Sequence, residues 1–134
     1  MKHMAKRIHI TSGPNRWSDM PRGERGLYDP HFTVPCAPGL VCGPLLAYEH
    51  YDTREGFDVC LARVALADAI YHFHDGPSVD SGVLEIGFAL GLEKPVYIGC
   101  PRDLGRYAAW PNAATKIFLG SSAECWDLFI KEMS

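Results

Sequence analysis

Two carboxylates that lie close together in the chain, Asp80 and Glu85, are the best candidates for catalytic chemistry. Glu85 belongs to the proline-free segment Gly82–Leu92, whose other residues are all apolar or glycine. On so apolar a helix, an ionised carboxylate has to be paired, to point into a cleft or to have a raised pKa. Because helical side chains lean toward the N-terminus, we expect Glu85 to project over the preceding loop, which holds Asp75 and Ser81.

Two short apolar runs flank this helix and predict buried strands. Ala69–Phe73 precedes the loop and Val96–Gly99 follows the helix, so the stretch has the strand, loop, helix, strand order of one βαβ unit. We interpret Gly87 and Gly91, one turn apart, as positions where the helix lies close on the sheet. Open α/β sheets bind their ligands at the carboxyl ends of such strands.

Alternating apolar residues, turn signals and capping residues predict the remaining elements. We expect strands over Lys6–Ser12, Gly39–Cys42 and Thr115–Leu119, and irregular structure elsewhere between Leu27 and His50. We expect a helix from the cap Thr53 to about Ala67, and a terminal helix that begins at the capping box Ser121-x-x-Glu124. With right-handed crossovers, this order predicts one doubly wound, mostly parallel sheet with helices on both faces, of the Rossmann or flavodoxin type.

Length and composition are those of an ordinary globular domain. The chain has 134 residues, of which 47% are hydrophobic and 22% charged, so we expect residues 1–134 to form a single domain, with 1–5 as a tag or a disordered start. The five cysteines are odd in number and lack C-x-x-C spacing, which favours neither a disulfide framework nor a zinc site. Without a membrane-length apolar run or a signal peptide, we expect a cytoplasmic protein and no membrane partner.

Charge and motifs also exclude several partners. A net charge of −3 with no Lys/Arg cluster predicts no nucleic-acid polymer as a partner. The first strand is followed by S-G-P-N-R rather than G-x-G-x-x-G, so we expect neither NAD nor FAD, nor any other cofactor. His72 and His74 have the spacing of a His-x-His metal motif, but further ligands at a suitable spacing are missing. We therefore predict no metal site and interpret the two histidines as hydrogen-bonded framework.

The segment Asp80–Tyr97 reads D-S-G-V-L-E-I-G-F-A-L-G-L-E-K-P-V-Y, with an Asp, a Gly, a Glu followed by a hydrophobic residue and Gly, an Ala, and a Lys-Pro-Val. This order resembles the signature of the nucleoside 2-deoxyribosyltransferase family. The segments Leu66–Ile70 and Ile8–Pro14 resemble the family's approach to that motif and its opening strand and turn. The chain departs from the family in having one residue fewer between Gly82 and Glu85.

The resemblance implies an enzyme that cleaves or exchanges the N-glycosidic bond of a nucleoside, a deoxynucleoside or its 5′-monophosphate. This small molecule would be the partner of the chain. Glu85 would attack C1′, and Asp80 would orient or protonate the base. The resemblance also implies a homodimer or a larger homo-oligomer, with Asn112 reaching a neighbouring subunit's site. The residues expected to bind substrate are Gly13, Arg16, Asp75, Ser81, Gly82 and Asn112.

Two other functions remain open. A nucleotide-sensing domain of the same fold would bind its ligand without consuming it, the shortened spacing having ended catalysis. A signalling-type α/β domain would instead bind another protein. Taken singly, Glu85 is explained as a first-turn residue on the helix dipole and Asp80 as an N-cap, and only the two together favour the enzyme.

Overall fold

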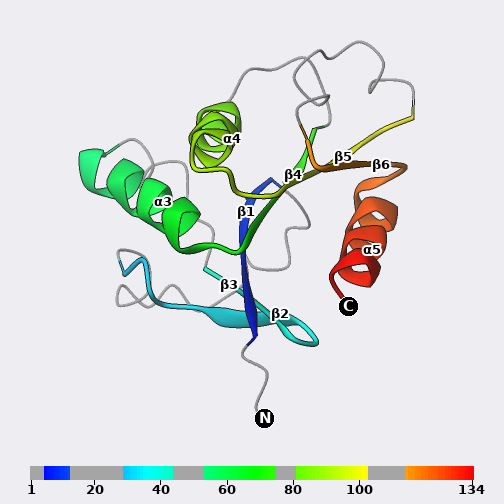
Figure 1. Cartoon of the computed structure of the whole chain (residues 1–134), viewed down its shortest axis with the longest axis horizontal. Coiled ribbons are helices and arrows are strands. Elements are labelled where there is room, and N and C mark those ends of the chain that lie inside the picture. Colours follow the sequence, from blue (N-terminus) through cyan, green and yellow to red (C-terminus); the bar gives the residue numbers. More distant parts are fainter. Residues whose placement is uncertain (1–4, 13–28, 44–52, 75–80, 103–113) are drawn as a thin grey trace.

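The chain folds into a six-stranded mixed sheet covered by helices on both faces (Figure 1). The computed structural model describes residues 5–12, 29–43, 53–74, 81–102 and 114–134. Within them, the strands are β1 Lys6–Ser12, β2 Val34–Ala37, β3 Leu40–Cys42, β4 Ala69–Phe73, β5 Val96–Cys100 and β6 Lys116–Leu119, and the helices are α3 Arg54–Leu66, α4 Ser81–Gly91 and α5 Ser122–Met133. The predicted doubly wound, mostly parallel α/β fold is confirmed.

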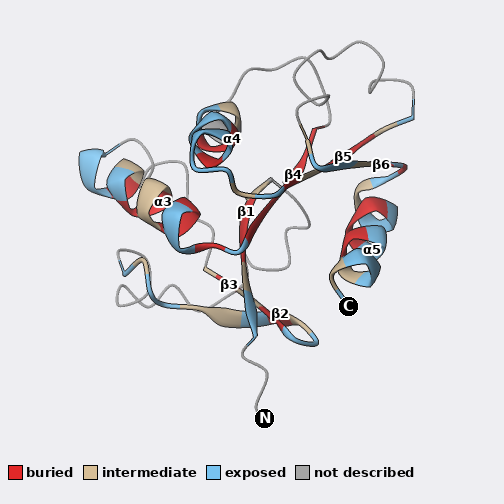
Figure 2. Ribbon diagram, in the orientation of Figure 1, coloured by how far each residue is buried: buried red, intermediate tan, exposed pale blue. Residues whose placement is uncertain are grey.

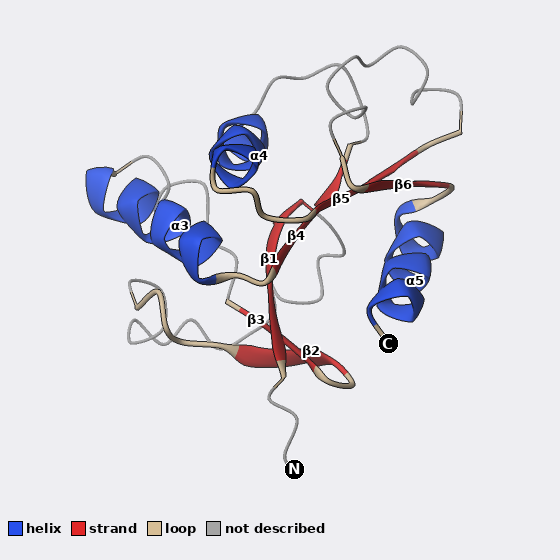
Figure 3. Cartoon of the chain, in the orientation of Figure 1, coloured by secondary structure: helices blue, strands red, loops and turns tan. Residues whose placement is uncertain are grey.

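The sheet has the order β2-β3-β1-β4-β5-β6, in which only β2 is antiparallel to its neighbour (Figure 3). From β1 the chain continues to β2 and β3 on one side, and from β4 it continues to β5 on the other. The five parallel strands alone therefore have the flavodoxin-like order. The strand order reverses between β1 and β4, and in such sheets the carboxyl ends at that point form the ligand crevice.

Two apolar cores hold the layers together (Figure 2). Under α5, the fully buried rings of Trp126 and Phe129 pack against Tyr71 of β4, with centroids 5.2 and 4.8 Å from it. Under α3 and α4, the second core includes Ile70 and Ile98 from the sheet. Because β4 is covered on both faces, each of its residues is buried and the whole strand reads as apolar or aromatic apart from His72.

Strand β1 is apolar on one face only. Ile8 and Ile10 belong to the core under α5, so the alternation of a strand turns Arg7, His9 and Thr11 toward α3 and α4. A central, covered strand normally presents apolar residues on both faces. The polar side of β1 is therefore the feature of the sheet that packing alone does not explain.

Two predictions about local structure were wrong. The segment around Pro35 was expected to be irregular but forms β2, whose edge position tolerates a proline without an amide hydrogen. Gly87 and Gly91 were expected to lie on the sheet, but both are exposed, because α4 turns Ile86 and Ala89 inward instead. None of the helices in the described part of the chain is long and apolar enough to cross a membrane.

Candidate functional site

Glu85 is paired with a histidine of the central strand. It is only 4% exposed, and its Oε1 lies 2.6 Å from Nε2 of His9, which is itself 8% exposed. Helix α4 brings the carboxylate over the middle of β1, and the ring donates its Nε2 hydrogen to it. An ionised carboxylate on this helix was expected to be paired, to point into a cleft or to have a raised pKa, and the structure shows that Glu85 is paired.

A second polar pair lies further along β1, nearer the carboxyl edge of the sheet. Thr11 of β1 shares a hydrogen bond with Nδ1 of His72 on the neighbouring strand β4, and His72 is 2% exposed. The His72 and His74 rings lie 6.2 Å apart and are tilted by 30°. The expectation that His72 belongs to a hydrogen-bonded framework is confirmed. No cluster of three or more metal-binding side chains occurs in the described ranges.

Arg63 brings a buried positive charge to the same side of the sheet. The side chain extends from α3 and is only 6% exposed. Burial lowers the pKa of its guanidinium, while the negative charges of Asp29 and Glu85 act in the opposite direction. The guanidinium passes so close to Gly43 that a Cβ there would lie 3.0 Å from Arg63 Nε, which explains the glycine after β3.

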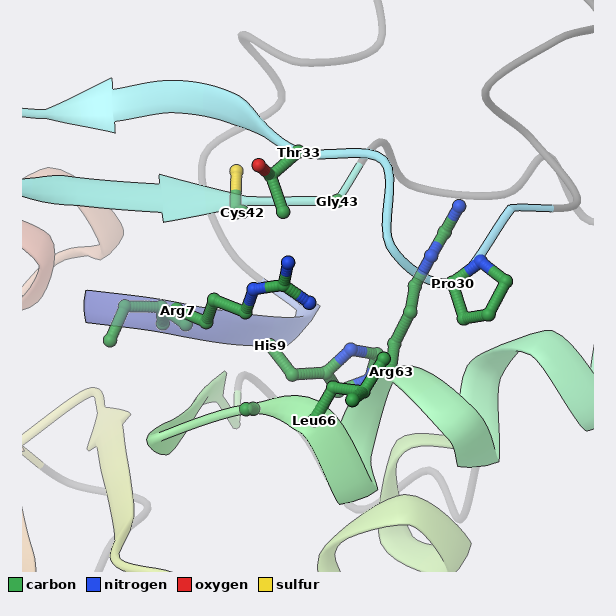
Figure 4. Close-up of a pocket in the computed structure, with 10 residues that line it drawn as sticks. Arg7, His9, Pro30, Thr33, Cys42, Gly43, Arg63 and Leu66 are labelled. Atoms are coloured by element: carbon green, nitrogen blue, oxygen red, sulfur yellow. The ribbon is translucent and has the colours of Figure 1, made fainter. Parts of the chain in front are cut away.

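A small pocket lies between α3, β1 and the end of β3 (Figure 4). Arg7 and His9 reach it from β1 and Arg63 reaches it from α3. Its volume is about 20 Å³, which is room for one water-sized group. Such a pocket receives one oxygen of a ligand rather than the whole ligand. We call it the basic pocket; its other lining residues are Ile8, Pro30, Thr33, Cys42, Gly43, Leu66 and Ala67.

Together these side chains form a polar layer between the sheet and the two helices. His9 joins the parts, because it lines the basic pocket and also holds Glu85. Arginine guanidinium groups are well suited to planar anions such as phosphate and carboxylate. The carboxylate of Glu85 keeps the His9 ring in one orientation beside that pocket. The arrangement is therefore equipped to bind an anionic group.

Most of the site residues predicted from sequence cannot be compared with this arrangement. Gly13, Arg16, Asp75, Asp80 and Asn112 lie outside the described residues. The backbones of Ser81 and Gly82 open α4, but only Glu85 of the predicted set has a described side chain.

Sequence reasoning missed His9, Thr11 and Arg63. The available signal was the alternation of polar residues with Ile8 and Ile10 in a strand expected to be central.

Comparisons with known proteins give a fold but no family. No protein-family model matches the chain, and no curated protein matches it. One similar solved structure is Era in complex with MgGDPNP and part of 16S ribosomal RNA, with a TM-score of 0.54 and 13% identity over 98% of this chain and 56% of that chain. Another is a variant of Aquifex aeolicus Era bound to GDP.AlF4-, with a TM-score of 0.48 and 14% identity over 96% of this chain and 55% of that chain. The chain thus spans about half the length of the chains it matches.

These comparisons correct the functional reading of the sequence. The resemblance to the nucleoside 2-deoxyribosyltransferase family was wrong, and so was the transferase or glycosidase activity inferred from it, because no family model matches and the solved structure that shares the fold is a complex of Era. The resemblance depended on the short segment Asp80–Tyr97, and a strand, loop, apolar helix and strand recur throughout α/β sheets. Excluding a nucleic-acid polymer was also wrong, because Era shares the fold and is bound there to ribosomal RNA.

Proposed function

We propose that this chain is a nucleotide-binding α/β domain whose ligand is anchored in the basic pocket between α3, β1 and the end of β3. The observation that carries the proposal is that Arg7, Arg63 and His9 meet at this pocket, beside the first half of β1 and the carboxyl end of β3. In this proposal, an anionic oxygen of the ligand enters the pocket. The rest of the nucleotide extends toward the carboxyl edge of the sheet.

Two considerations support this ligand class. Two arginines at one pocket suit a phosphate, and the pocket lies beside the carboxyl end of a strand, β3, where open α/β sheets bind their ligands. The fold is that of Era, which is bound to MgGDPNP in a solved structure. The sequence contains no Gly-Lys pair and therefore no G-x-x-x-x-G-K-[ST] phosphate loop, so arginines would take the part of the lysine in that motif.

Each polar pair has a role in this proposal. Glu85 acts through His9 as a positioning residue, holding the ring at the wall of the pocket. The pair of Thr11 and His72 holds β1 and β4 together where the ligand would lie.

We further propose that residues 1–134 form a single domain and that it works in the cytoplasm. Five free cysteines, all of them buried, are in keeping with a reducing compartment.

A thermal-shift panel tests the proposal. Nucleoside mono-, di- and triphosphates with and without Mg²⁺, the parent nucleosides, inorganic phosphate and a single-stranded RNA are added separately to the full chain. Because a ligand that binds the native state raises its melting temperature, we expect a rise with nucleotides and none with nucleosides. A rise with RNA alone would replace the proposal with a nucleic-acid-binding function, and no rise with any nucleotide would refute it.

Variants test whether the basic pocket causes the nucleotide-dependent rise in melting temperature. Arg7→Met should abolish the nucleotide-dependent rise, because it removes a guanidinium from the wall of the pocket. Gly43→Ala should weaken the rise, because the added Cβ displaces the Arg63 guanidinium. Lys116→Met is the matched control, since this lysine lies on β6 in an exposed pair with Glu132, and its response should equal that of the wild type. If Arg7→Met also responds like the wild type, the ligand binds elsewhere.

A further inference from the structure

Helix α4 presents an apolar face to solvent. Leu84, Gly87, Phe88 and Gly91 follow the i, i+3, i+4, i+7 spacing of a single helix face, and all four are exposed. We call them the outer face of α4; it lies opposite the buried side of the helix in Figure 2. Leu84 is 61% exposed, and the only charged residue of the helix, Glu85, is buried on the other side. A surface helix normally carries polar residues on this face.

The two glycines of the outer face have no explanation within the described chain. Glycine inside a helix is destabilising relative to alanine, because it loses more conformational freedom on folding. A Cβ added at Gly87 or at Gly91 would meet no described atom within 4 Å, so the fold leaves room for a side chain at both positions. A missing side chain is useful where another backbone approaches closely. Among the described residues, the two glycines therefore leave room for another molecule to approach the helix closely.

We propose that the outer face of α4 binds the same face of a second copy of this chain, with the two helices antiparallel across a two-fold axis. The face is complementary to itself, because Leu84 and Phe88 project while Gly91 and Gly87 leave hollows one turn further along. In the antiparallel arrangement, each projecting side chain lies over a glycine of the other copy. A two-fold interface needs only one such self-complementary patch.

The charge and size of the face fit this occupant. A charged residue near a two-fold axis would face its own copy and repel it, and the outer face carries none. With the flanking Leu90 and Leu92, which are 38% and 43% exposed, the projecting side chains offer roughly 300 Å² of apolar surface per copy. A standard interface covers about 800 Å² per partner, so this patch supplies the apolar centre and polar neighbours supply the rim. We expect a dimer that dissociates on dilution.

Sedimentation velocity over a concentration series tests the proposal. The wild type should change from monomer to dimer as its concentration rises, and Leu84→Glu should remain a monomer with an unchanged melting temperature. The matched control is Leu128→Glu, which places the same charge on an exposed leucine of α5, 44% exposed, and should dimerise like the wild type. A wild type that is monomeric throughout, or a dimer that Leu84→Glu leaves intact, would overturn the proposal.

A second variant tests the hollows directly. Gly91→Leu fills one of them while its side chain has open space in the single chain, so the monomer should fold normally and the dimer should be lost. Flotation with phosphatidylcholine vesicles tests whether the outer face of α4 binds a membrane surface instead. If the wild-type protein floats with the vesicles and does not self-associate, the proposed dimer is wrong and the outer face of α4 binds a membrane surface. These outcomes do not depend on nucleotide binding.

Discussion

Removing the carboxylate of Glu85 should destabilise the fold more than removing a carboxylate from an exposed pair. In Glu85→Ala, the buried His9 ring loses an acceptor at 2.6 Å, and leaving a buried hydrogen-bonding group without its partner costs about 1–3 kcal/mol. Domains of this kind have free energies of unfolding of about 5–15 kcal/mol, so this loss is a large fraction of the total. Glu85→Gln keeps an acceptor oxygen in nearly the same place and should therefore cost less than Glu85→Ala.

The control is Glu132→Ala, which breaks a pair of similar length, 2.8 Å, between exposed Lys116 and Glu132 side chains. Exposed pairs contribute about 0–1 kcal/mol, so this variant should unfold almost like the wild type. The assay is urea unfolding followed by far-UV circular dichroism, with His9→Ala and the double variant completing a thermodynamic cycle. If Glu85→Ala costs no more than Glu132→Ala, or if the cycle shows no coupling between Glu85 and His9, the buried pair does not hold the site together.

Four further predictions concern capping, pH and helix propensity. Ser121→Ala removes the N-cap of α5 and should cost about 1 kcal/mol in urea unfolding. Hydrogen bonds from Ser121 hold the pKa of Glu124 below 4.5, so the capping box contributes stability above that pH and loses it as the pH falls; melting curves of Glu124→Gln should lack this acid dependence. Burial raises the pKa of Cys60 from 9.0 to about 12, so in this pH range the folded chain keeps a thiol proton that the unfolded chain releases. The stability should therefore fall as the pH rises through this range, and it should fall less steeply in Cys60→Ala. Gly87→Ala should stabilise the dilute chain by up to about 1 kcal/mol, and a destabilised monomer would show that the position is not open.

Local signals predicted much of the fold. The bounds of β1 and β4 agree with the predicted Lys6–Ser12 and Ala69–Phe73, because short apolar runs between turn residues identify covered strands without knowledge of their partners. Thr53 and Ser121 cap α3 and α5 as expected, since capping depends on residues within one turn. The strand β2 was missed because only its pairing with β3 at the edge of the sheet makes a segment with Pro35 a strand.

The site was less predictable because its contacts join distant parts of the chain. The partner of Glu85 lies 76 positions away in sequence, and nothing local to His9 indicates it. Arg63 was read as part of an ordinary helix, because its burial depends on the glycine at position 43 and on the packing of α3 over β1. The family resemblance failed for the opposite reason, since a short local pattern was taken to identify a whole function.

The most direct test of nucleotide binding is to follow the histidine ring signals by NMR during a titration of the full chain. The titrants are a nucleoside 5′-triphosphate with Mg²⁺ and, separately, the parent nucleoside. We predict a saturable shift of the His9 ring nitrogens with the triphosphate, little change with the nucleoside, and no change at the exposed His31. If the His9 signals stay in place while the triphosphate saturates the protein, or if no nucleotide binds at all, the basic pocket is not a nucleotide site.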